Sequence, residues 1–205
     1  MSLLHPFKRR WPSESSRQGG RAWLSFWAAL GIALGVAVIL APLVSAPPAP
    51  PPGQSLPTPE NVWHLLLQAA PANGVDPHFA YAIAMAESNL DPHAFDRGAR
   101  GLMQMRLDAW ESVSNEPFRE AWNWEKNADA ALKYLGQCRN FLMDHHAYST
   151  GLLAACYHYG PQAVADADFQ IAHLPRPRNS LYRQLFNGDA APVPPPGDTS
   201  ASPTS

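Results

Sequence analysis

No charged side chain occurs between residues 22 and 44, a run made mostly of leucine, valine, isoleucine, alanine and tryptophan. At about 1.5 Å of rise per residue, a helix of this length crosses the ~30 Å hydrocarbon core of a bilayer. The run therefore predicts a single transmembrane helix. Any folded domain must then lie on one side of a membrane.

The residues before this run predict its orientation. Residues 1–21 carry five basic side chains and one acid, and a basic flank stays cytoplasmic by the positive-inside rule. Trp23 and Trp27 lie at the expected interface, where indole rings are enriched. The prediction is a single-pass inner-membrane protein with its domain in the periplasm. A cleaved signal peptide ending at Val44-Ser45-Ala46 is the alternative, although the apolar run is long for one and Pro47 would follow the cut.

Two proline-rich segments set the limits of the folded domain. Residues 45–59 are dominated by proline and should form a stiff, extended linker. Residues 189–205 repeat that composition with small polar residues and predict a disordered tail. A 205-residue chain has room for one ordinary domain. That domain is expected in residues 60–188.

Helix-start signals recur through residues 60–188. Thr58-Pro59 and Asp76-Pro77 each place a capping side chain before a proline suited to the first helical position, and Asn73-Gly74 supplies a stop between them. No strand of alternating β-branched residues is evident. The prediction is an all-α domain. Three later helices are expected: one capped by Asn127 and ending near Met143, one capped by Ser149 or Thr150 and ending near His158, and a short one opened by Pro161.

One acidic residue lies on an otherwise apolar helix face. Phe79, Ile83 and Glu87 are four residues apart, so they share one face of the helix after Asp76. Burial raises the pKa of a carboxyl group, and a glycosidase needs such a group to protonate the leaving oxygen. Glu87 is therefore the candidate catalytic acid. The alternative is that Glu87 lies at the end of its helix and points to solvent.

Several classes of site are disfavoured by the composition. The basic residues do not form the clustered face of a nucleic-acid-binding protein. His145 and His146 are adjacent, and no spacing typical of a metal site occurs, so neither metal nor cofactor is predicted. Cys138 and Cys156 lie on the expected outer side of the membrane and on two helices joined by a short connection. A disulfide between them is predicted, with two free thiols as the alternative.

The residues around Glu87 match a known pattern. Glu87-Ser88 is followed by Pro92 and Ala94, and residues 98–104 read Gly-Ala-Arg-Gly-Leu-Met-Gln. This segment resembles the signature of the soluble lytic transglycosylase family, whose catalytic domain has a lysozyme-like helical fold. Residues 127–135, 155–161 and 175–182 resemble the family's later motifs in the same order. The resemblance covers about residues 62–186.

Three positions depart from the family pattern. His158 stands where the family has an asparagine, the closing motif lacks its usual glutamate near Arg178, and the loop before Gly98 is about a residue short and lacks a serine. These departures concern the details of the substrate subsites.

The resemblance implies both an activity and a set of site residues. Glu87 would act first as acid and then as base. Cleavage would fall on the β-1,4 bond between N-acetylmuramic acid and N-acetylglucosamine in peptidoglycan glycan strands, leaving a 1,6-anhydro ring. Gln104 could donate to an acetamido oxygen, and the two tyrosines could stack on sugars or bind Glu87. The implied substrate-binding residues are Ser88, Met103, Gln104, Tyr157, His158 and Tyr182.

Two other functions are kept open. A hydrolytic muramidase needs a second carboxylate, for which Asp91 and Asp96 are the nearest candidates. A non-catalytic peptidoglycan-binding scaffold finds support in His158 and in the altered closing motif. Whichever of these functions applies, an anchor with a short linker would hold the domain near the inner membrane. That position suggests service to a wall-spanning secretion or conjugation apparatus.

Overall fold

The structure is a computed structural model that describes residues 57–197. The basic segment, the predicted transmembrane run and most of the linker lie outside this range. Within it, none of the helices has the length and apolar character needed to cross a bilayer. The elements are α1 (Pro59–Ala69), the 3-10 helix η1 (Pro71–Asn73), α2 (Pro77–Ser88), β1 (Phe95–Asp96), β2 (Ala99–Arg100), α3 (Leu107–Val113), the 3-10 helix η2 (Phe118–Trp122), α4 (Trp124–Asp144), α5 (Thr150–Tyr159), α6 (Pro161–Asp166), the 3-10 helix η3 (Ile171–His173) and α7 (Ser180–Phe186).

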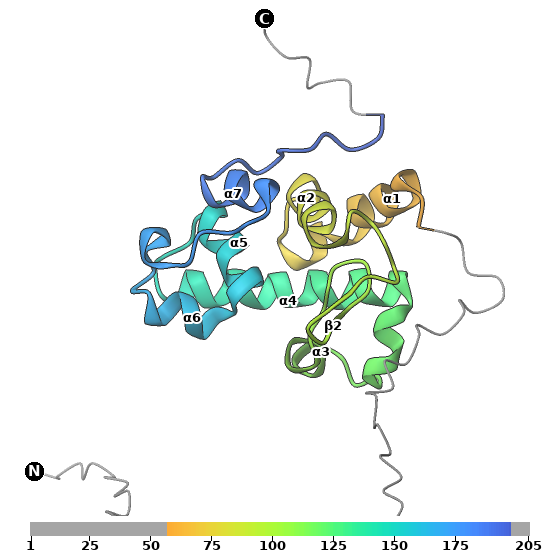
Figure 1. The fold of residues 1–205 in the computed structure, drawn as a ribbon, viewed down its shortest axis with the longest axis horizontal. Coiled ribbons are helices and arrows are strands. Elements are labelled where there is room, and N and C mark those ends of the chain that lie inside the picture. Colours follow the sequence, from red (N-terminus) through yellow and green to blue (C-terminus); the bar gives the residue numbers. More distant parts are fainter. Residues whose placement is uncertain (1–56, 198–205) are drawn as a thin grey trace, which may run out of the picture. The chain divides into compact units, whose positions relative to one another are not determined.

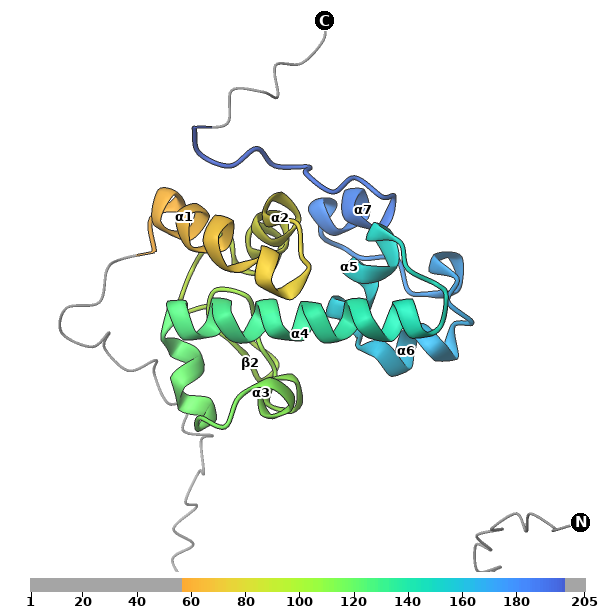
Figure 2. The ribbon, with the colours of Figure 1, turned by 180° about the vertical axis from the view of Figure 1, so that it is seen from behind.

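Helix α4 is the longest element and forms the centre of the domain (Figure 1). Helices α1 and α2 lie along one side of it, and α3 lies with the hairpin on the other (Figures 1 and 2). Helices α5, α6 and α7 gather at its C-terminal end. The core side of α4 is apolar, with Ala128, Leu132 and Leu135 fully buried. Burial of this stripe against its neighbours supplies the main driving force for the fold.

Most of the predicted helix starts are confirmed by their caps. The Thr58 hydroxyl accepts the Asn61 N–H at 3.2 Å, and the Asp76 carboxylate accepts the His78 N–H at 2.7 Å. The Ser149 hydroxyl accepts the Leu152 N–H at 3.2 Å at the start of α5. Each cap satisfies a backbone donor that the first helical turn leaves free.

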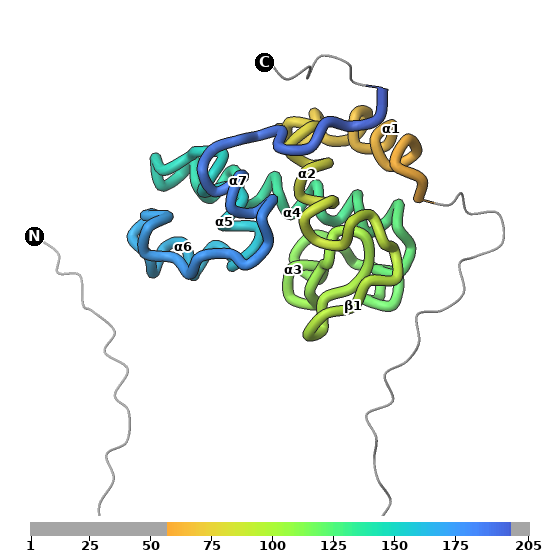
Figure 3. Tube along the Cα trace, turned by 45° about the horizontal axis from the view of Figure 1, so that its top comes forward, coloured from red at the N-terminus to blue at the C-terminus, as the bar shows by residue number. Residues whose placement is uncertain are grey.

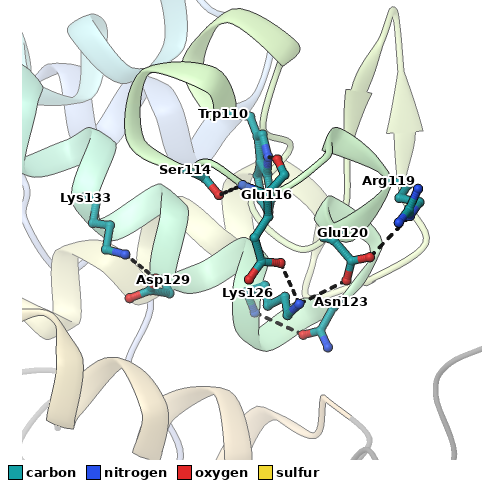
Figure 4. Close-up of polar contacts among 9 residues, drawn as sticks. All are labelled: Trp110, Ser114, Glu116, Arg119, Glu120, Asn123, Lys126, Asp129 and Lys133. Atoms are coloured by element: carbon teal, nitrogen blue, oxygen red, sulfur yellow. Dashed lines mark hydrogen bonds and ion pairs between the residues drawn. The ribbon is translucent and has the colours of Figure 1, made fainter.

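The predicted start of the long helix is wrong. Helix α4 begins at Trp124, and its cap is Asn123, whose side chain accepts the Lys126 N–H at 3.0 Å (Figure 4). Lys126 also bonds Glu116 at 2.5 Å and Glu120 at 3.1 Å, which lowers the pKa of the Glu120 carboxyl. Asn127 lies inside the helix. Its side chain does not cap the helix and instead forms hydrogen bonds with a loop described below.

The all-α prediction needs one correction. Strands β1 and β2 form a short antiparallel hairpin, with Phe95 opposite Arg100. The two turn residues, Arg97 and Gly98, both have positive φ, at 46° and 91°. Two such residues make the tight turn whose twist suits a β-hairpin. Strands of two residues are too short to show an alternating pattern, so the sequence carried no signal for them.

The segment after α7 also differs from expectation. Composition predicts a disordered tail from residue 189, and in the structure residues 189–197 run back over α2 toward α1 (Figure 3). Val193 packs against the core, and Pro196 lies beside Trp63 of α1. At Val193 this proline-rich segment therefore packs on the domain. Residues 198–205 lie outside the described range.

Candidate active site

Glu87 lies in the last turn of α2, on the face predicted for it. Phe79 and Ile83 on that face are buried, and the Glu87 side chain is only 16% exposed. Asn89 ends the helix with a left-handed conformation, so the chain turns away directly after the Glu87-Ser88 pair. The carboxyl group therefore lies at the end of the helix, where a substrate can reach it, and not in the middle of the helix.

A groove of about 500 Å³ opens in front of Glu87. Its size suits a ligand of several sugar-sized groups. A larger and more open depression, about 700 Å³, lies between η1, α3 and α4, and Glu87 is not part of it. The groove is the candidate active site because it contains the candidate acid. Its lining residues are Glu87, Asp96, Arg97, Ala99, Gln104, Met105, Arg106, Asp108, Ala109, Tyr134, Tyr157, His158, Tyr159 and Gly160.

Tyr182 holds the Glu87 carboxyl group from behind. Its hydroxyl donates a hydrogen bond to Oε1 of Glu87, although the two residues are 95 positions apart in the chain. The Tyr182 side chain is buried, and burial together with the charge of Glu87 raises its pKa well above the usual value. The hydroxyl therefore remains a protonated donor at physiological pH. It occupies one carboxyl oxygen and leaves the other for substrate.

His158 flanks the carboxyl group from α5. Its Nδ1 lies 3.8 Å from Oε1 of Glu87, and its ring contacts that of Tyr182 in a tilted arrangement, with centroids 4.1 Å apart. The imidazole is 30% exposed and lines the groove. The residue that departs from the family pattern thus stands beside the acid, within reach of a bound ligand.

A buried asparagine holds the loop that forms one wall of the groove. Oδ1 of Asn127 accepts the Met103 N–H at 2.8 Å, and its Nδ2 donates to the carbonyls of Arg100 and Ala121, both at 2.9 Å. Gly101 passes so close that an added Cβ would lie 2.3 Å from the Ala121 oxygen, and its φ of 78° also disfavours a side chain. This loop therefore has one tightly specified path.

Two predicted substrate contacts turn out to support the same loop. Ser88 donates from Oγ to the Leu102 carbonyl at 2.5 Å. Gln104 lines the groove, but its amide nitrogen already donates to the carbonyls of Ala94 at 2.8 Å and Gly101 at 2.9 Å. The expected donation from Gln104 to an acetamido oxygen is thus not available in this arrangement. Both side chains act here by shaping the groove wall.

The roles expected for three further residues also change. Met103 is fully buried and is not among the residues that line the groove, so this structure gives its side chain a place in the core rather than beside a ligand. Tyr157 lines the groove but is largely buried, and its hydroxyl donates to the Met103 carbonyl at 2.7 Å. Tyr182 is too deeply buried to stack on a sugar ring. The alternative expectation, that a tyrosine hydrogen-bonds to Glu87, is met by Tyr182.

The two candidate second carboxylates separate in space. Asp91 is outside the groove, and its carboxylate accepts the His93 N–H at 2.8 Å in a local turn. Asp96 lines the groove from β1, but its side chain is 79% exposed. Sequence reasoning missed Asp108 and Tyr134, which line the groove from α3 and α4. No motif marks Asp108, whereas Tyr134 falls in a segment that resembles the family.

Cys138 and Cys156 are neighbours but carry free thiols, so the predicted disulfide is not formed in this structure. Both are buried between α4 and α5. The pKa of the Cys138 thiol is raised, mainly by its hydrogen bond with Cys156 and also by burial. Across residues 57–197, no cluster of three or more histidine, cysteine, aspartate or glutamate side chains could hold a metal ion.

A mainly helical domain with one shielded carboxyl group in a groove is the arrangement of a lysozyme-like protein. Residues 64–173, slightly more than half of the chain, match the family described as the transglycosylase SLT domain. The chain therefore belongs to this family. Membership implies a lytic transglycosylase that acts on peptidoglycan. No curated protein matches the chain.

Proposed function

We propose that Glu87 is the acid and base of a peptidoglycan lytic transglycosylase reaction. The observation that carries this proposal is the difference in shielding among the groove carboxylates. The Glu87 side chain is 16% exposed, whereas Asp96 and Asp108 are 79% and 86% exposed. General acid catalysis requires a carboxyl group that can hold a proton at working pH, and shielding from water favours the neutral form.

The proposed reaction uses one carboxyl group twice. Protonated Glu87 gives its proton to the glycosidic oxygen, and the bond between that oxygen and C1 of N-acetylmuramic acid breaks. The C6 hydroxyl of the same sugar then forms a bond to C1, and its proton returns to the Glu87 carboxylate. The products are an N-acetylglucosamine hydroxyl end and a 1,6-anhydro ring, so no water is consumed.

The product decides between this reaction and hydrolysis. Purified sacculi digested by the protein should yield muropeptides with anhydromuramyl ends, identified by mass spectrometry. Reducing N-acetylmuramic ends would instead support a hydrolytic muramidase, with Asp96 as the second carboxylate. Asp96 is a poor candidate, because it is highly exposed and lies 3.9 Å from the guanidinium of Arg97. Binding to sacculi without any cleavage would support a scaffold.

The location of the domain forms a second part of the proposal. We infer that residues 22–44 anchor the chain in the inner membrane and that the domain works in the periplasm, as the charge asymmetry and the proline-rich linker suggest. A domain held within tens of ångströms of the membrane suits local opening of the wall for a secretion or conjugation apparatus. Fractionation of cells and co-purification with such an apparatus test both points. Recovery only in soluble fractions would contradict the anchor.

Replacing Tyr182 with phenylalanine tests the support behind Glu87. The variant loses the hydrogen bond that holds the Glu87 carboxyl group in place, so kcat should fall about tenfold, the loss expected for one such bond. Tyr148→Phe, at an exposed tyrosine, is the control. A wild-type kcat in Tyr182→Phe would contradict the role.

A further inference from the structure

The distance between Glu87 and Tyr182 depends on how two helices meet. Glu87 is near the end of α2, and Tyr182 is in the first turn of α7. The two helices are separated by most of the domain in sequence but lie side by side (Figures 1 and 2). A hydrogen bond between their side chains needs both the angle and the register of the helices to be set. Apolar packing alone tolerates small sliding movements.

Asn179 links the two helix ends with a single side chain. Its Oδ1 accepts the N–H groups of Leu181 at 2.8 Å and Tyr182 at 3.4 Å, which caps α7. Its Nδ2 donates to the Ala86 carbonyl at 2.8 Å. Ala86 directly precedes Glu87. One amide group therefore contacts the backbone of Tyr182 and of the residue next to Glu87.

The Ala86 carbonyl lacks the partner that a longer helix would give it. In an uninterrupted helix it would accept from the N–H of residue 90. Asn89 and Leu90 both have positive φ, at 55° and 67°, so α2 ends before that bond can form. The Ala86 carbonyl is one of the acceptors that every helix end leaves free. Asn179 satisfies it from the neighbouring helix.

We propose that Asn179 is a positioning residue that sets Tyr182 against Glu87. The inference rests on the proposed function, because it concerns how the acid is held for that reaction. An asparagine is suited to the task because it has an acceptor and a donor on one rigid amide. Serine and aspartate also cap helices well, but serine is too short to reach the Ala86 carbonyl and aspartate has no donor for it.

The test compares the same substitution at two helix caps. Asn179→Ser keeps an N-cap for α7 and removes the bond to Ala86. Asn123→Ser at α4 is the matched control, because Asn123 also caps a helix but lies at the N-terminal end of α4, whereas α7 lies near the other end (Figure 1). Asn179→Ser should lower kcat by up to about tenfold with little change in KM, because it acts through the Tyr182 bond whose complete loss costs about that much. Asn123→Ser should retain wild-type kinetics.

A double-mutant cycle with Tyr182→Phe separates positioning from general support. If Asn179 acts through Tyr182, Asn179→Ser should add almost no further loss of kcat in the Tyr182→Phe background. Losses of kcat that simply multiply in the double variant would assign Asn179 a structural role and overturn the inference.

A crystal structure of Asn179→Ser gives a readout that does not need activity. The Tyr182 hydroxyl should lie beyond hydrogen-bond distance of Glu87 in the variant, while α7 keeps its helical start. An intact bond between these two side chains would overturn the inference even if the wild-type protein cleaves peptidoglycan. Conversely, a wild-type protein that releases no muropeptides would refute the proposed function, and the crystal structure would still decide the role of Asn179.

Discussion

Glu87→Gln is expected to abolish release of anhydromuropeptides from sacculi, with a loss of about 10²- to 10⁴-fold or more in rate. Glutamine has almost the same shape and can still accept the hydrogen bond from Tyr182 through its amide oxygen. It cannot donate a proton to the glycosidic oxygen or accept one from the C6 hydroxyl. The fold should therefore survive while the chemistry is lost, which liquid chromatography of the digest measures directly.

Asp96→Asn is the matched control for this experiment, because it removes a second groove carboxylate by the same change of atoms. We expect this variant to retain most of its activity. A loss equal to that of Glu87→Gln, together with reducing ends in the wild-type digest, would point to a two-carboxylate muramidase. Full activity in Glu87→Gln would remove Glu87 from the mechanism.

Asn127→Ala is expected to cost about 3–5 kcal/mol of unfolding free energy, since it leaves one buried N–H and two carbonyls without the partner they now have. It also opens a cavity beside the Gly101 backbone. The loop that walls the groove should loosen, so activity should fall even at temperatures where the domain remains folded. Urea unfolding, followed by circular dichroism, gives the free energy.

Asn140→Ala tests whether the effect belongs to the buried site. Asn140 lies on the same helix as Asn127 but is exposed, and its side chain accepts only a long 3.4 Å bond from Arg139. Its replacement should change the unfolding free energy by no more than about 0.5 kcal/mol. Equal losses from the two variants would show that Asn127 contributes through helix propensity rather than through its three hydrogen bonds.

Local signals in the sequence predicted the starts of four α-helices of the described residues, whereas α3 and α7 were not predicted. The starts of α1, α2, α5 and α6 follow from Pro59, Pro77, Ser149 and Pro161, because capping and the fixed φ of proline act within a few residues. The start of α4 failed for an instructive reason. Asn123 and Asn127 are equally good caps by residue type. Only the tertiary structure shows that Asn123 caps the helix while the Asn127 side chain binds buried backbone groups of a loop.

The candidate acid was accessible to sequence reasoning, but its support was not. The spacing of Phe79, Ile83 and Glu87 places a carboxyl group on a buried face without reference to any distant residue. Tyr182 is 95 positions away, and nothing local distinguishes a tyrosine that stacks on a sugar from one that holds the acid. Met103 shows the same difficulty, since a motif position next to a groove can still point into the core.

The sequence by itself determined the helical character of the domain, the position of Glu87 on its helix and membership of the transglycosylase SLT domain family, because these depend on short-range spacing and caps. Only the tertiary structure decided which groups meet the carboxyl group: Tyr182 behind it, His158 beside it, and Asn179 across the helix ends. Those contacts join segments separated by 71 to 95 residues. Their geometry follows from the packing of α2, α5 and α7 together, which no stretch of a few residues encodes.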